Sequence, residues 1–164
     1  MIITYQDLSK IREEFSGKRI VFCSGSFDIP HAGHVLFLED CKKNGDILVV
    51  AVGSDAILRK SRGNERPVLN EHIRIKTIDS FKPVDFSLLD KNSGDDYSLS
   101  FIETVFKELR PDIYVINQDA YDIDFRKKLS EKFNVELIIL ERLCPQEFEE
   151  ISATKIINKI KKIA

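Results

Sequence analysis

Short apolar runs alternate with amphipathic segments along most of this chain. The apolar runs, most of them rich in valine, isoleucine or leucine, lie at residues 20–23, 47–52, 84–88, 113–116 and 135–140. Runs this short and this rich in β-branched residues are typical of strands that are buried on both faces of a sheet. The pattern therefore predicts five β-strands.

Helical periodicity fills the gaps between the predicted strands, at residues 33–43, 69–81, 98–109, 125–133 and 152–163. The first of these segments ends at Asn44-Gly45, which is a strong helix stop signal. Strands that alternate with helices of about ten residues imply βαβ units with right-handed crossovers. We therefore expect an α/β fold, a Rossmann-like doubly wound five-stranded parallel sheet with helices on both faces.

Length and composition set the domain organisation. The 164 residues fit one domain over residues 1–164, with residues 1–18 as an N-terminal extension and residues 152–163 as a C-terminal helix. The apolar fraction of 43% and the charged fraction of 32% are typical of a globular chain rather than a disordered one. The net charge of −2 argues against a nucleic-acid partner, which usually needs a basic face.

Cysteine usage and hydropathy indicate where the protein works. The odd set of Cys23, Cys41 and Cys144 has no CxxC spacing, which favours the reduced thiols of an intracellular protein. Residues 1–18 lack the basic start and apolar block of a signal peptide. The longest apolar run, residues 47–52, is far shorter than the ~18 residues of a membrane span. We expect a cytoplasmic protein without a membrane partner.

Ligands of open parallel sheets bind beyond the carboxyl ends of the strands, near the switch in strand order. Residues 24–34, Ser-Gly-Ser-Phe-Asp-Ile-Pro-His-Ala-Gly-His, follow the first predicted strand and run into a predicted helix. Gly25 and Gly33 remove side-chain bulk where the backbone must turn or a ligand must approach. The start of that helix offers unpaired N–H groups to an anion, and His31 and His34 lie beside it.

Other interpretations of this segment are weaker. The H-x-x-H spacing suits a metal pair, but no third histidine or cysteine is clustered with it, so we expect no metal held by the protein. A lone histidine near a helix start is usually a surface residue, yet two of the chain's three histidines lie here within four residues. The segment is neither a Walker loop nor a GxGxxG dinucleotide loop.

The segment resembles the (T/S)GxFDxxHxGH signature of the cytidylyltransferase-like nucleotidyltransferases and meets every fixed position. The resemblance implies that His31 and His34 contact the triphosphate and stabilise charge while an acceptor phosphate oxygen displaces pyrophosphate directly. No covalent enzyme intermediate is implied. Asp28 is expected to orient a histidine or the loop backbone, and it stays a candidate for the substrate. The remaining signature residues become candidates for the nucleotide site: Ser24, Gly25, Ser26, Phe27 (mainly as a packing residue) and Gly33.

Basic and acidic side chains after the second strand add further candidates. Residues 59–67 are basic and contain a glycine, so they form either a solvated loop or a mobile phosphate clamp. In the clamp Arg62 stands where relatives place a lysine, and Lys60 is the fallback. Asp55 either caps the next helix or touches the substrate. By resemblance, Arg74 reaches the nucleotide phosphates or the substrate.

Two further segments differ in how well they match the family. Ile151, Ser152 and Thr154 resemble its ISTTxI segment and are expected to contact the nucleotide, although Ser152 is also a good N-cap. Residues 116–118 read Ile-Asn-Gln where sugar-phosphate relatives tend to have a lysine and two glycines. Asn117 and Asp119 remain candidates for the substrate, whose identity is in question at this point.

The overall layout resembles most closely the adenylyltransferase domain of ADP-heptose synthesis, on residues 45–50, 63–67, 109–112 and 150–152. Glycerol-3-phosphate and other alcohol-phosphate cytidylyltransferases come second, and flavin or other adenylyltransferases third. The departures at Arg62 and at Asn117-Gln118 also leave open a nucleotide-binding regulatory protein without catalysis.

The expected ligands follow from this resemblance. They are ATP or CTP, a small phosphorylated acceptor of the heptose 1-phosphate kind, and Mg²⁺ bound through the triphosphate. The choice between ATP and CTP stays open because base edges are commonly read by backbone groups. The family is often dimeric, so a homodimer is a further option.

Overall fold

The computed structural model describes residues 1–90, 99–142 and 144–163. Five strands pair in parallel in the order β3-β2-β1-β4-β5. They are β1 (Ile20–Gly25), β2 (Ile47–Val52), β3 (Phe86–Leu89), β4 (Ile113–Asn117) and β5 (Glu136–Leu140). The expected five-stranded Rossmann-like sheet is confirmed, with strand ends that differ from the predicted ones by up to two residues.

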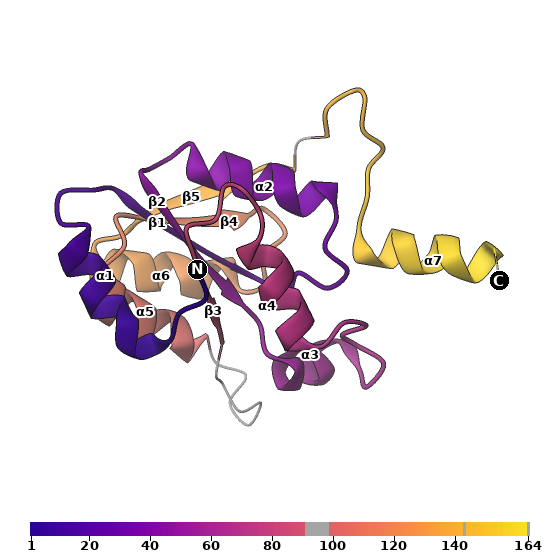
Figure 1. Ribbon diagram of the computed structural model, residues 1–164, viewed down its shortest axis with the longest axis horizontal. Coiled ribbons are helices and arrows are strands. Elements are labelled where there is room, and N and C mark those ends of the chain that lie inside the picture. Colours follow the sequence, from indigo (N-terminus) through magenta and orange to yellow (C-terminus); the bar gives the residue numbers. More distant parts are fainter. Residues whose placement is uncertain (91–98, 143, 164) are drawn as a thin grey trace.

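Helices cover both faces of this sheet (Figure 1). On one face α1 (Leu8–Glu14), α5 (Ser100–Leu109) and α6 (Ile123–Phe133) pack on a core that contains Phe22 and Tyr114. On the other face α2 (Ala32–Lys42) and α4 (Glu71–Asp79) pack on a core that contains Val21 and Cys23. The remaining helical elements are η1 (Tyr5–Asp7), α3 (Asp55–Arg62) and α7 (Ala153–Ile163).

Three differences from the predicted helices stand out. The N-terminal extension is folded, because Leu8 and Ile11 of α1 are buried in the first core. The first half of the basic segment 59–67 is not a loop, since α3 runs through it and ends where Gly63 adopts φ +91°. Ser98, the predicted start of the third helix, lies outside the described residues, and α5 begins at Ser100.

The face of α2 that meets the core is narrow. Leu38 and Cys41 are fully buried, whereas Leu36 and Phe37 are half-buried. Along the described chain, no helix is both long and apolar enough to cross a membrane.

The switch in strand order lies between β1 and β4. From β1 the chain passes through α2 to β2 and then to β3, and from β3 it returns through α5 to β4 on the other side of β1. The carboxyl ends of β1 and β4 therefore lie side by side with connections that leave in opposite directions, which is where such sheets bind ligands.

The last helix stands apart from the other elements. Figure 1 shows α7 projecting away from the sheet, and none of its residues is buried. Its isoleucines Ile160 and Ile163 are 58% and 79% exposed. The segment that leads into α7 returns to the body of the protein, as described below.

Substituting Gly45 is expected to disturb the pairing of β1 with β2. A Cβ atom on Gly45 would lie 2.7 Å from the carbonyl oxygen of Arg19, which accepts hydrogen bonds from Asp46 and Ile47. We expect Gly45→Ala to lower the free energy of unfolding by about 1–3 kcal/mol, the usual cost of overpacking. Urea denaturation measures this, with exposed Glu39→Ala on α2 as the control. Equal stability of Gly45→Ala and the unaltered protein would contradict the packing argument.

Candidate active site

The segment after β1 is folded around the ring of Phe27. A Cβ atom on Gly25 would lie 2.9 Å from the tip of this ring, so only glycine leaves room for it. Phe27 itself is 3% exposed and contacts the ring of His34 edge-on, with 5.3 Å between centroids. The expectation that Phe27 packs is confirmed. Its ring supports a histidine and leaves little surface for a ligand.

His31 and His34 are held in one orientation by backbone amides. Nδ1 of His31 accepts a hydrogen bond from the N–H of Gly33 at 3.1 Å, and Nδ1 of His34 accepts one from the N–H of His31 at 3.3 Å. The two rings stack with 3.9 Å between centroids. Because each Nδ1 is an acceptor, each neutral ring carries its proton on Nε2. Both Nε2–H groups are then available as donors to a ligand at the start of α2.

The surroundings keep both imidazoles neutral. Burial lowers the pKa of His34 to about 3, and the positive charges of Arg142 and Arg62, together with His31, contribute to the shift. Burial, and after it Arg142, also lowers the pKa of His31. The histidines therefore act as neutral hydrogen-bond donors near pH 7, and the positive charge of the site comes from the arginines.

Arg142 is a further candidate residue that sequence reasoning did not select. It lies two residues beyond the end of β5 and forms an ion pair with Asp119, at 2.7 Å, after the end of β4. Its charge reaches both histidines. Its position just after the end of β5 was the sequence signal that could have identified it. The charges of Arg62 and Arg142 both act on His34, and Arg62, like Lys60, is exposed on α3.

Arg74 has an internal role in place of the expected phosphate contact. Its side chain is fully buried and donates hydrogen bonds to the carbonyl oxygens of Leu69 and Ser26 and to the carboxylate of Asp55, at 2.9, 2.6 and 2.8 Å. No surface of the guanidinium is left for a ligand. We therefore reassign Arg74 as a positioning residue that ties the segment after β1 to α3 and α4.

Ser54, rather than Asp55, caps α3. The hydroxyl of Ser54 accepts from the N–H of Ile57, so the capping role, one of the two considered for Asp55, belongs to its neighbour. The carboxylate of Asp55 pairs with Arg74 at 2.8 Å and with Arg59 at 3.6 Å. Asp55 is therefore engaged inside the protein, and a substrate contact would have to break one of these pairs.

Asp28 orients the loop backbone rather than a histidine. Its carboxylate is 1% exposed and accepts hydrogen bonds from the N–H groups of Val68 and Leu69, at 2.9 and 3.2 Å. It also lies 2.9 Å from Nε of Arg66, as a buried ion pair without hydrogen-bond geometry. This geometry bears out the expectation that Asp28 orients the loop backbone, keeps its carboxylate engaged inside the protein, and anchors the end of the basic segment to the histidine segment.

The remaining candidates lie at the rim of the site. Ile151 lies over Gly33, because a Cβ atom there would be 3.7 Å from Cγ2 of Ile151. The hydroxyl of Ser152 accepts from the N–H of Lys155 at 3.1 Å, as an N-cap does, and Thr154 is exposed. Asn117, at the end of β4, is half-buried.

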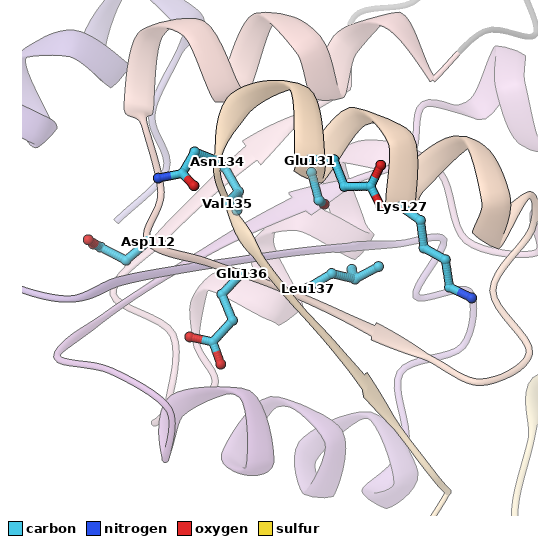
Figure 2. A pocket seen from close by; sticks show the side chains of 8 residues that line it. Asp112, Lys127, Glu131, Asn134, Val135, Glu136 and Leu137 are labelled. Carbon is cyan, nitrogen blue, oxygen red and sulfur yellow. The ribbon is translucent and has the colours of Figure 1, made fainter.

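A separate hollow of about 510 Å³ lies at the other edge of the sheet (Figure 2). Asp112 and Glu136 on its lining stand at the amino ends of β4 and β5, and Lys127 and Glu131 come from α6. The strands are parallel, so this edge is opposite the one that carries His31 and His34. The hollow is therefore no part of the candidate site.

The low pKa of His34 has a consequence for stability. An unfolded histidine binds its proton below about pH 6.5, whereas folded His34 binds it only near pH 3, so stability is lost as the pH falls between these values. We expect His34→Gln, which does not titrate, to lose less stability than the unaltered protein between pH 7 and pH 4. Urea denaturation across this range tests it, with exposed His72→Gln as the control. Parallel pH profiles for His34→Gln and the unaltered protein would contradict the low pKa.

Replacing Arg74 tests its positioning role. In Arg74→Lys the charge is kept, but one ammonium group cannot reach Leu69, Ser26 and Asp55 together. We expect a loss of about 1–3 kcal/mol in the free energy of unfolding, the cost of buried groups left unpaired. Chemical denaturation measures it, and Lys76→Ala on the exposed side of α4 should change little. If both variants lose the same amount, Arg74 does not tie the loops together.

Comparisons with known proteins agree with this geometry. A family model described as Cytidylyltransferase-like matches residues 22–159. The Bifunctional protein HldE of Campylobacter jejuni subsp. doylei is 38% identical over 145 residues, which cover 88% of this chain and 28% of that protein. The FAD synthase of Archaeoglobus profundus is 34% identical over 146 residues, which cover 85% of this chain and 84% of that protein.

Among solved structures, the lipopolysaccharide core biosynthesis protein from Thermoplasma volcanium GSS1 is 28% identical, with a TM-score of 0.59 over 83% of this chain and 100% of that one. The chain spans only 28% to 31% of the length of the HldE proteins that it matches. The family model covers most of the chain and includes both histidines and the Ser152 segment. The chain belongs to the cytidylyltransferase-like family of nucleotidyltransferases.

Proposed function

We propose that this protein transfers a nucleoside monophosphate from a nucleoside triphosphate to a small phosphate monoester and releases pyrophosphate. One observation carries the proposal. The Nδ1 atoms of His31 and His34 are both engaged by backbone N–H groups, which leaves two Nε2–H donors at the start of α2. Paired donors at a helix N-terminus suit the oxygens of a polyphosphate.

The chemistry follows from these donors. An anionic oxygen of the acceptor phosphate attacks the α-phosphorus, a new P–O bond forms, and the bond to the β-phosphate oxygen breaks in line with it. A phosphate monoester already carries this anion near pH 7, because its second pKa is about 6. A general base is therefore not required. His31 and His34 donate to the α- and β-phosphate oxygens, and Arg62 and Arg142 supply positive charge around them.

Mg²⁺ is proposed to enter with the triphosphate. Asp28 and Asp55, the carboxylates nearest in sequence to the histidine segment and α3, are occupied by Arg66, Arg74 and backbone amides. Among residues 1–90, 99–142 and 144–163, no three acidic, histidine or cysteine side chains are grouped to hold a metal ion. This donor set fits an ion that is bound by phosphate oxygens and water, where it would neutralise phosphate charge.

A sugar phosphate of the heptose 1-phosphate kind is the acceptor that we propose first, with ATP as the donor. The layout that resembles the adenylyltransferase domain of ADP-heptose synthesis and the match to HldE proteins at 31% to 38% identity support it. The similar structure from Thermoplasma volcanium is named for lipopolysaccharide core biosynthesis, which also fits a sugar substrate.

A second candidate is adenylyl transfer to flavin mononucleotide. The observation that favours it is the match to an FAD synthase over 84% of that protein. Flavin mononucleotide is also a phosphate monoester, so the same attack applies. Residues 116–118, which depart from the sugar-phosphate pattern, are where the two acceptors would be distinguished.

Pyrophosphate release tests the proposal directly. The protein is incubated with Mg²⁺, with ATP or CTP, and with heptose 1-phosphate, glycerol 3-phosphate or flavin mononucleotide in turn. We expect release with one acceptor well above the others. Calorimetric binding of a triphosphate without pyrophosphate release in any combination would overturn the transferase and favour a nucleotide-binding regulatory protein.

The histidines are expected to dominate the rate. His31→Ala and His34→Ala should each lower turnover by roughly 10²–10³, the scale of one lost electrostatic contact in the transition state. His72→Ala is the matched control, because this third histidine is exposed on α4. Unchanged turnover in both active-site variants would show that the reaction occurs elsewhere on the protein.

A further inference from the structure

A buried arginine lies on the face of the sheet opposite α2. The side chain of Arg126, on α6, is 8% exposed. Its Nε donates to the carbonyl oxygen of Tyr121 at 2.7 Å, and its Nη1 donates to the hydroxyl of Tyr114. The guanidinium carbon is 5.8 Å from the centroid of the Tyr114 ring. Arg126 thus joins the loop between β4 and α6 to strand β4 itself.

Tyr114 connects Arg126 to β1. Its ring is fully buried, stacks on Phe22 with 5.4 Å between centroids and meets Phe106 edge-on at 5.4 Å, so it has little freedom to move. On β1, Ser24 lies two residues beyond Phe22, the register partner of Tyr114. Burial raises the pKa of the Tyr114 hydroxyl, and the charge of Arg126 and the nearby side chain of Ser24 act against that shift. A neutral, fixed hydroxyl therefore lies between Arg126 and Ser24, which opens the histidine segment.

The charge of Arg126 is not balanced locally. Among the described residues, no carboxylate lies within ion-pair distance of Arg126, whereas buried Arg74 on the other face pairs with Asp55. A buried cation usually needs an anion beside it. The positive charge of Arg126 therefore rests on the Tyr121 carbonyl and the Tyr114 hydroxyl, in the first turns of α6 after the carboxyl end of β4.

We propose that Arg126 and Tyr114 are positioning residues, which hold the loop 117–122 against the Ser24 end of β1. This loop carries Asn117 and Asp119, the candidate acceptor residues, while Ser24 belongs to the nucleotide segment. The pair thus aligns the acceptor with the bound triphosphate. The inference rests on the proposed function, but it concerns the opposite face of the sheet from Arg74 and does not involve the histidines.

Steady-state kinetics test the positioning role in Tyr114→Phe, Arg126→Gln and Arg126→Lys, with exposed Lys128→Gln as a charge-matched control on α6. We expect Tyr114→Phe and Arg126→Gln to lower kcat roughly 10–100-fold at saturating triphosphate, the scale of a misplacement of about 1 Å. The triphosphate Kd of Tyr114→Phe should stay within about twofold, because that change removes no charge. Arg126→Lys keeps the positive charge but loses the forked guanidinium. Its triphosphate Kd should therefore match that of the unaltered protein, while its kcat stays low.

Hydrogen–deuterium exchange gives a readout that needs no turnover. Binding of ATP or CTP to the unaltered protein should slow exchange in both residues 31–34 and residues 118–122. In Tyr114→Phe the protection of 31–34 should remain and that of 118–122 should be lost. If the unaltered protein turns nothing over yet shows this pattern, the proposed function fails and the coupling stands.

Three results would overturn the positioning role. The first is no protection of 118–122 in the unaltered protein when a triphosphate binds. The second is unchanged protection and kcat in Tyr114→Phe and Arg126→Lys. The third is a lowered melting temperature in these variants with unchanged kcat and protection, which would leave the pair a purely structural role.

Discussion

The arrangement of the site depends on the buried guanidinium of Arg74. A cation with no exposure must have its donors satisfied inside the protein. Arg74 finds its acceptors in three separate segments: the carbonyl oxygen of Ser26 after β1, the carboxylate of Asp55 at the start of α3, and the carbonyl oxygen of Leu69 before α4. The loops that follow β1 and β2 are thereby fixed relative to each other, and Arg62 at the end of α3 is brought within electrostatic reach of His34.

This constraint explains how two neutral histidines can serve an anionic ligand. Burial and neighbouring positive charge keep the imidazoles neutral. Each neutral ring carries its one proton on Nε2, because its Nδ1 accepts a hydrogen bond from a backbone N–H. The arginines supply the positive charge, and the histidines supply hydrogen-bond donors of fixed orientation.

The sequence predicted the sheet, most helices and the histidine segment, because these depend on periodicity and on a local motif. It did not predict α3, whose apolar positions are few among charged residues. It left Asp28 and Asp55 between a structural role and the substrate, and by resemblance it assigned Arg74 to the nucleotide phosphates or the substrate. A motif locates a residue relative to a strand end, but whether its side chain turns outward or inward is decided by partners distant in sequence, such as Val68 for Asp28. Arg142 was missed although it follows a strand end.

The backbone of the histidine segment shows why so many internal contacts are needed. Phe27 and Ile29 adopt φ of 46° and 52°, a region that residues other than glycine rarely occupy and that persists only where the surroundings determine it. The contacts come from all sides. Arg74 holds the carbonyl of Ser26, Asp28 is anchored to residues 66–69, and the Phe27 ring fills the space that Gly25 leaves. On the other face the ring of Tyr114, which Arg126 contacts, stacks on Phe22 two residues before Ser24. Two buried charged residues, Asp28 and Arg74, therefore act where the backbone must be kept in a costly conformation, directly before the two histidines.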